Sequence, residues 1–279
     1  MGPAPSPIRK SLIAAALAAT LALSINQPAS AQYSPSPYYG QPPASPPNNA
    51  FQNNRIQLNN RYRQLLESAR RLIGEGRPQN ALPVLAEAAA INSRDPEVHF
   101  WRGLALDKLS DYKDAVKSYA HCLTMAKTAG MDSSELRINL GNTLVKLNYL
   151  NEALFDYQRA IEITPTSGLP HLYLGRLYLI KTDYNLALDE FRKCESLNYH
   201  DTYLPFFKSL AYTGLKRYGD AQEELRPLLT SFSKTGTPDL FRLASTLDST
   251  LSKELEAEAK TKSGNKNRER QTRSGRDSD

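Results

Sequence analysis

The stretch Leu140–Pro165, "LGNTLVKLNYLNEALFDYQRAIEITP", decides the fold of this 279-residue chain. Small residues stand at Gly141, Ala153 and Ala160, and large apolar residues fill most of the gaps at helical spacing. Small side chains in such a pattern indicate two helices that pack so closely that a larger side chain would not fit between them.

The same pattern recurs along the chain. Counted from Gly141, a small residue follows at offset 12, a large one at 16 and another small one at 19 in the clearest units. Equivalent origins are Ala69, Gly103, Gly175 and Ser209, so that consecutive origins lie 34, 38, 34 and 34 residues apart. A nearly constant period predicts a repeat protein. The short junctions within each unit predict two antiparallel helices per repeat.

These repeats resemble a known family, the tetratricopeptide repeats. The resemblance covers residues 62–230 and rests on Leu140-Gly141, Leu174-Gly175, Ala115/Tyr119, Ala153/Tyr157 and Ala187/Phe191. It implies an all-α fold, a right-handed α-solenoid of about five helix-turn-helix repeats. The family's usual large aromatic residue four before the glycine is absent, and His99, Arg137 and His171 stand in that position.

The sequence predicts four segments: a signal peptide at 1–31, a proline-rich disordered spacer at 32–54, the repeats with a C-terminal capping helix at 55–258, and a disordered basic tail at 259–279. Arg9 and Lys10, a short apolar run and the exit Ala29-Ser30-Ala31 are typical of a cleaved secretory signal. An uncleaved anchor would need about 20 continuous apolar residues. We therefore expect no transmembrane segment in the mature chain.

The capping helix is predicted from a start signal at Pro238 and from one apolar stripe, as the end of a solenoid requires. The stripe consists of Leu240, Leu243, Leu247, Leu251 and Leu255.

The net charge of +6 is concentrated at the ends of the chain. Arg9 and Lys10 carry two charges, and residues 260–279 hold seven basic and three acidic residues. The region between them is therefore neutral, which argues against nucleic-acid binding by the folded body. Two interpretations of the tail stay open, a solvated end that aids solubility or weak contact with an anionic surface.

The sequence contains no recognisable catalytic, cofactor-binding or metal-binding motif, and we expect no enzyme activity and no cofactor. Cys122 and Cys194 occupy equivalent positions two repeats apart, too far for the roughly 7 Å between Cα atoms that a disulfide allows. Both are predicted to be small, buried core residues.

The resemblance further implies that the first helix of each repeat lines a concave groove, where a peptide or partner helix binds. The residues expected to form this partner-binding groove are Phe100, Leu104, Ile138, Asn142, Leu169, Leu172, Arg176, Leu179, Tyr203 and Phe206. The segment "HLYLGRLYLIK" (171–181) is apolar on nearly every side, so either neighbouring repeats or a partner must cover it.

The sequence thus predicts a non-enzymatic scaffold or adaptor of the cell envelope that binds a protein partner. The alternative is a surface-tethered structural protein, whose basic tail and proline-rich spacer contact cell-wall polymer or membrane. The expected location is the periplasm, with the thylakoid lumen and the extracellular medium as alternatives.

Overall fold

The computed structural model describes residues 49–128, 132–235 and 238–274 of the chain. These residues form eleven helices and no strand, which confirms the predicted all-α fold. Five helices are the first members of a pair: α2 (Asn49–Gly74), α4 (Pro96–Lys108), α6 (Ser134–Lys146), α8 (Gly168–Ile180) and α10 (Leu204–Gly214). Their partners are α3 (Pro78–Ile91), α5 (Tyr112–Thr128), α7 (Leu150–Ile163), α9 (Tyr184–Ser196) and α11 (Tyr218–Thr235), and α12 (Pro238–Ser274) follows.

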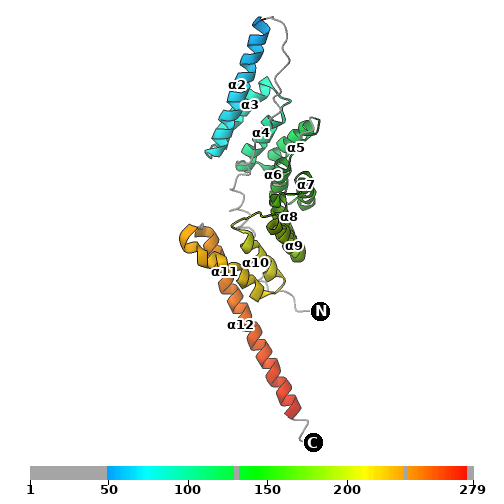
Figure 1. Cartoon of the computed structure of the whole chain (residues 1–279), viewed down its shortest axis with the longest axis vertical. Coiled ribbons are helices and arrows are strands. Elements are labelled where there is room, and N and C mark those ends of the chain that lie inside the picture. The colour runs from blue at the N-terminus through cyan, green and yellow to red at the C-terminus, as the bar shows by residue number, and fades with distance from the viewer. Residues whose placement is uncertain (1–48, 129–131, 236–237, 275–279) are drawn as a thin grey trace. The chain divides into compact units, whose positions relative to one another are not determined.

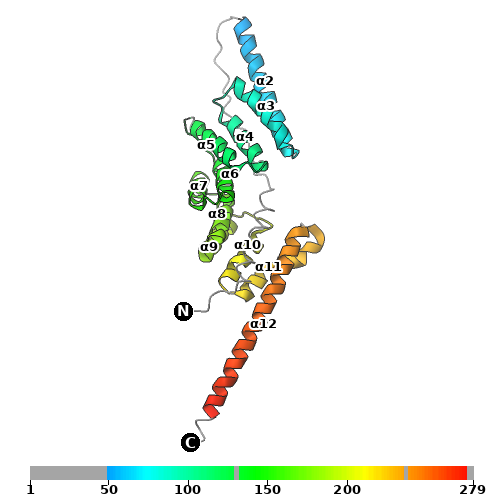
Figure 2. The ribbon, with the colours of Figure 1, turned by 180° about the vertical axis from the view of Figure 1, so that it is seen from behind.

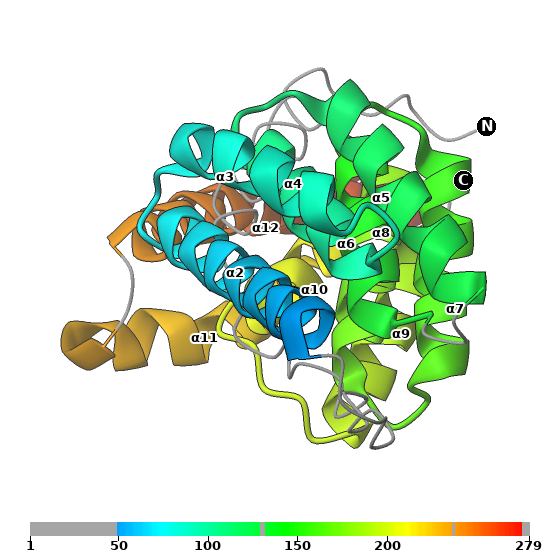
Figure 3. The same ribbon diagram turned by 90° about the horizontal axis from the view of Figure 1, so that it is seen from above.

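The described residues fall into two compact units, one up to Tyr173 and the other from Leu174 onward. Within the N-terminal unit, α2 packs on α3, α4 on α5 and α6 on α7, and α2, α3 and α4 lie next to one another (Figure 1, Figure 3). Within the C-terminal unit, α10 packs on α11 and α11 on α12 (Figure 2).

Each glycine origin lies directly against the aromatic residue at offset 16. A Cβ atom added to Gly141 would stand 2.6 Å from Cε1 of Tyr157, and one added to Gly175 would stand 2.5 Å from Cε1 of Phe191. Both aromatic rings are buried. Because real Cβ atoms essentially never approach another atom so closely, the glycines set the distance between the two helices of a repeat.

The turn inside each repeat is also the same in all five. Its central residue lies seven positions after the origin and has a positive φ: Gly76 (73°), Ser110 (64°), Asn148 (62°), Thr182 (63°) and Lys216 (61°). The next residue donates its backbone N–H across the turn, over 2.9 Å, to a carbonyl of the first helix, as in Arg77 to Leu72 and Asp183 to Tyr178. This bond closes the C-terminus of the first helix, and its repetition extends the predicted register to the first and fifth repeats.

Arg137 occupies the position where the family usually carries an aromatic residue, and it is 2% exposed. Its Nη1 donates to Asp156 over 2.7 Å and its Nη2 donates to Asp132 over 2.6 Å. The two carboxylates compensate the buried charge, and the bond to Asp156 connects α6 to α7, the partner helix of the same repeat.

The ends of the described chain differ from the expectations. Helix α2 begins at Asn49, inside the predicted spacer and two residues after its last proline, Pro47. Helix α12 continues to Ser274, although residues 259–279 are predicted to be disordered. Residues 260–274 contain no proline and hold three lysines and three arginines, residue types that favour a helix without any apolar stripe. The predicted signal peptide lies outside the described residues.

Two glycines of one turn test this backbone account. Gly74 lies in the last turn of α2 and Gly76 has a φ of 73°, and a Cβ at either position would have no atom within 4 Å. We expect Gly74→Ala to stabilise the chain by up to about 1 kcal/mol, because alanine favours the helix. Gly76→Ala should cost about 1–2 kcal/mol, because alanine is strained at positive φ. Urea unfolding followed by circular dichroism measures both, and equal effects of the two changes would contradict the account.

Candidate functional site: the first helices of the repeats

Most of the residues predicted to line the groove are buried within the chain. Seven of the ten are at most 7% exposed: Phe100, Leu104, Ile138, Leu172, Leu179, Tyr203 and Phe206. Asn142, Leu169 and Arg176 are half-buried. The apolar side chains of α8 are thus covered largely by the chain itself, and their apolar character alone does not require a partner.

The first helices of the N-terminal unit instead present a cluster of charged residues around a tryptophan. We call Arg70, Glu97, Trp101 and Glu135 the Glu97–Glu135 cluster. Nε1 of Trp101 donates a hydrogen bond to Oε1 of Glu97 over 3.0 Å, and the guanidinium carbon of Arg70 lies 5.3 Å from the centre of the Trp101 ring. Arg70, Glu97 and Glu135 are half-buried, whereas Trp101 is 2% exposed.

Burial dominates the electrostatics of this cluster. It raises the pKa of Glu135 to about 7, although the charge of Arg70 acts in the opposite direction. Burial also raises the pKa of Glu97, against the hydrogen bond from Trp101. Oε1 of Glu135 is buried and has no hydrogen-bond partner among the described residues. The cluster thus contains two carboxyl groups and one arginine, and burial disfavours the charged form of both carboxyl groups.

Sequence reasoning did not single out Glu97 and Glu135. Both stand six residues before a glycine origin, Gly103 and Gly141. Leu169 holds the same position before Gly175 and is one of the predicted groove residues. The repeat register alone would have identified the two glutamates as members of the same surface.

In the C-terminal unit, Arg176 lies over an aromatic group. Its guanidinium carbon is 5.2 Å from the centre of the Phe207 ring, which stacks on Tyr203 and on Phe191 at centroid distances of 6.3 and 6.1 Å. Burial raises the pKa of nearby Asp201, while its hydrogen bond from the Tyr203 backbone and the charge of Arg176 act in the opposite direction. Of the groove residues predicted in this unit, Arg176 is the one that keeps access to solvent.

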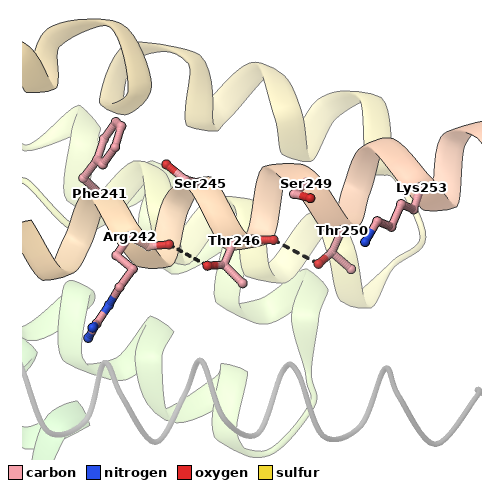
Figure 4. Close-up of a pocket in the computed structure, with 7 residues that line it drawn as sticks. All are labelled: Phe241, Arg242, Ser245, Thr246, Ser249, Thr250 and Lys253. Atoms are coloured by element: carbon pink, nitrogen blue, oxygen red, sulfur yellow. Dashed lines mark hydrogen bonds between the residues drawn. The ribbon is translucent and has the colours of Figure 1, made fainter.

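A wide hollow of about 530 Å³ runs along α12 (Figure 4). The described residues that line it all come from that helix: Phe241, Arg242, Ser245, Thr246, Ser249, Thr250 and Lys253. The hydroxyls of Thr246 and Thr250 donate to backbone carbonyls one turn earlier, those of Arg242 and Thr246, so neither hydroxyl proton is turned toward the hollow.

The two cysteines, the remaining candidate residues, are part of the packed core. Cys122 and Cys194 are free and buried, as predicted, and burial raises the pKa of each thiol to about 12. Among the described residues, no group of three His, Cys, Asp or Glu side chains is placed to hold a metal ion. No helix in that part of the chain has the length and apolarity needed to cross a bilayer.

The tetratricopeptide repeat family model matches residues 96–128 and 134–167, which correspond to the helix pairs α4–α5 and α6–α7. This chain contains tetratricopeptide repeats. No curated protein matches it by sequence.

Solved structures of other tetratricopeptide repeat proteins share the fold. MamA residues 41-end from Desulfovibrio magneticus RS-1 is 19% identical, with a TM-score of 0.56 over 63% of this chain and 98% of that one. A tetratricopeptide repeat protein from Parabacteroides merdae ATCC 43184 is 15% identical, with a TM-score of 0.59 over 73% and 77%. YrrB, described as a tetratricopeptide repeat protein with an unusual peptide-binding site, is 19% identical, with a TM-score of 0.51 over 75% and 98%. At these identities the likeness shows the fold.

The raised pKa of Glu135 gives the tetratricopeptide repeats of the N-terminal unit a testable pH dependence. Between the ordinary pKa of 4.5 and about 7, the folded state binds more protons at Glu135 than the unfolded state does. The contribution of Glu135 to the free energy of unfolding therefore falls as pH rises through this window. A glutamine does not titrate. The free energy of unfolding of Glu135→Gln, measured by urea unfolding, should therefore rise relative to that of the wild type as the pH increases from 5 to 7. A difference that does not change with pH would contradict the assignment.

Proposed function

We propose that this tetratricopeptide repeat protein is a non-enzymatic scaffold of the cell envelope that binds a peptide or helix of a partner protein along its first helices. Tetratricopeptide repeats serve as protein–protein interaction scaffolds and are typically non-catalytic. The peptide mode of binding is supported by one protein of the same fold, YrrB, which is described as having a peptide-binding site.

The observation that carries this proposal is the Glu97–Glu135 cluster. Two glutamates at the same position of adjacent repeats are partly accessible, and one buried carboxylate oxygen has no hydrogen-bond partner among the described residues. A lysine or arginine side chain from a partner would supply the missing donor and offset the cost of burying the negative charge. The partner segment is therefore basic where it crosses the second and third repeats.

The proposed location is the periplasm, with the thylakoid lumen and the extracellular medium as alternatives. It rests on the predicted signal peptide, outside the described residues. The alternative function, a surface-tethered structural protein, is supported by the basic residues that α12 carries after residue 259. In that case the tail and the spacer contact wall polymer or membrane, and the first helices bind nothing.

Binding assays with charge-neutral variants separate the two functions. The predicted groove residues Leu172 and Phe206 are unsuitable for such variants. Their side chains are 3% and 0% exposed, and a glutamate introduced at either position would disrupt the core. The variant of choice combines Glu97→Gln with Glu135→Gln. Its matched control combines Asp111→Asn with Glu152→Gln, two exposed carboxylates outside the first helices.

We expect immobilised wild-type protein to retain a partner from an envelope extract, and the double glutamine variant to bind that purified partner at least about tenfold more weakly, a loss of about 1.4 kcal/mol. The control should bind like the wild type, and circular dichroism should show all three folded. Equal binding by all three proteins would refute the proposed site. Loss of envelope association on deletion of residues 260–279, with the cluster intact, would favour the structural alternative.

A further inference from the structure

A small cavity lies between α3 and α4 of the N-terminal unit, and none of the residues that line it belongs to the Glu97–Glu135 cluster. Its volume is about 170 Å³. Leu82, Leu85, Ala89, Val98 and Leu106 form its apolar lining. Ala86 and Arg102, which also line it, are exposed, so the cavity opens to solvent at these two residues.

The cavity lies where this junction lacks two leucines that the next junction carries. Ala89 lies 20 residues after its origin, and the corresponding residue of the second repeat is Leu123. Arg102 stands one residue before its origin, and the corresponding residue of the third repeat is Leu140. The junction between the second and third repeats thus contains two leucines. The junction between the first and second repeats contains an alanine and an exposed arginine at the same positions, which leaves space for an apolar group.

Two polar residues, Arg102 and His99, line the cavity together with the apolar side chains. Arg102 forms no hydrogen bond or ion pair with another described residue. The pKa of exposed Asp114 is lowered chiefly by Lys117 and to a smaller degree by Arg102. On the other side of the opening, Nε2 of His99 donates to the carbonyl of Ser93 over 2.9 Å, and its ring meets that of His121 edge-on at 5.3 Å. The arginine is thus the charged group at the mouth that is available to a ligand.

We propose that this α3–α4 pocket binds one leucine or phenylalanine side chain of a partner peptide, with the carboxylate of that residue or of an adjacent acidic residue against Arg102. A dry cavity of about 150 Å³ accommodates a benzene molecule, so a cavity of about 170 Å³ has room for one such side chain. Pockets for whole drug-sized ligands or cofactors start at about 300 Å³. The planar guanidinium of arginine matches a carboxylate in geometry and charge.

N-acetyl-phenylalanine is a small probe that carries both features, and its amide is the matched neutral probe. With isotope-labelled full-length protein, we expect the acid to shift the NMR signals of Ala89, Val98 and His99 with a dissociation constant on the order of 1 mM, a typical value for so small a ligand. The amide should bind severalfold more weakly, because it lacks the carboxylate. Failure of the acid to shift these signals, or equal binding of acid and amide, would overturn the proposal.

Three substitutions assign the binding to the cavity. Ala89→Leu should abolish it while preserving the fold, because the next repeat carries leucine at that position, and Ala90→Leu on the exposed side of the same helix should leave it unchanged. Ala86→Glu, at an exposed position of the mouth, should abolish the preference for the acid over the amide without disturbing the core. Unchanged binding of the acid by Ala89→Leu and Ala86→Glu would show adventitious surface binding and overturn the proposed pocket.

Discussion

The contact between a small residue on the first helix and a large one on the second is the constraint on which the repeats depend. Where the origin is glycine, the partner is Tyr119, Tyr157 or Phe191. Where the origin gains a Cβ atom, as at Ala69 and Ser209, the residue at offset 16 shrinks to Leu85 and Leu225. The combined side-chain volume at the two positions therefore stays similar from repeat to repeat, because a close-packed interface tolerates neither overlap nor a void.

Much of the fold could be predicted from the sequence because this contact leaves a readable pattern. The small and large residues at fixed offsets located all five helix pairs, and the start signal at Pro238 located the beginning of α12. The turn residues were harder to predict. Ser110, Thr182 and Lys216 adopt a positive φ that L-amino acids generally avoid, and only the fixed geometry of the surrounding repeat imposes it. The continuation of α12 was missed because a solvated helix has no apolar period.

The candidate site was less predictable, since apolar character does not distinguish core from surface. Leu172, Tyr203 and Phe206 were placed in a groove, yet the helices around them bury them almost completely. The repeat register places Glu97 and Glu135 on the same surface, and the structure adds their burial, the raised pKa of each and the neighbouring Trp101. The residues proposed for binding, Ala89 and Arg102 among them, stand at repeat positions whose side chains differ between repeats.

The most direct test of the packing constraint is a double-mutant cycle within the C-terminal unit. It combines Gly175→Ala with Phe191→Leu, the exchange that Ser209 and Leu225 already approximate in the fifth repeat. Overpacking by Gly175→Ala alone should cost about 1–3 kcal/mol. The free energy of unfolding of the double variant should exceed the additive expectation by at least about 1 kcal/mol, because the smaller side chain makes room for the new methyl group. Additivity within about 0.5 kcal/mol would contradict the account, since it would show that the two positions do not share one space.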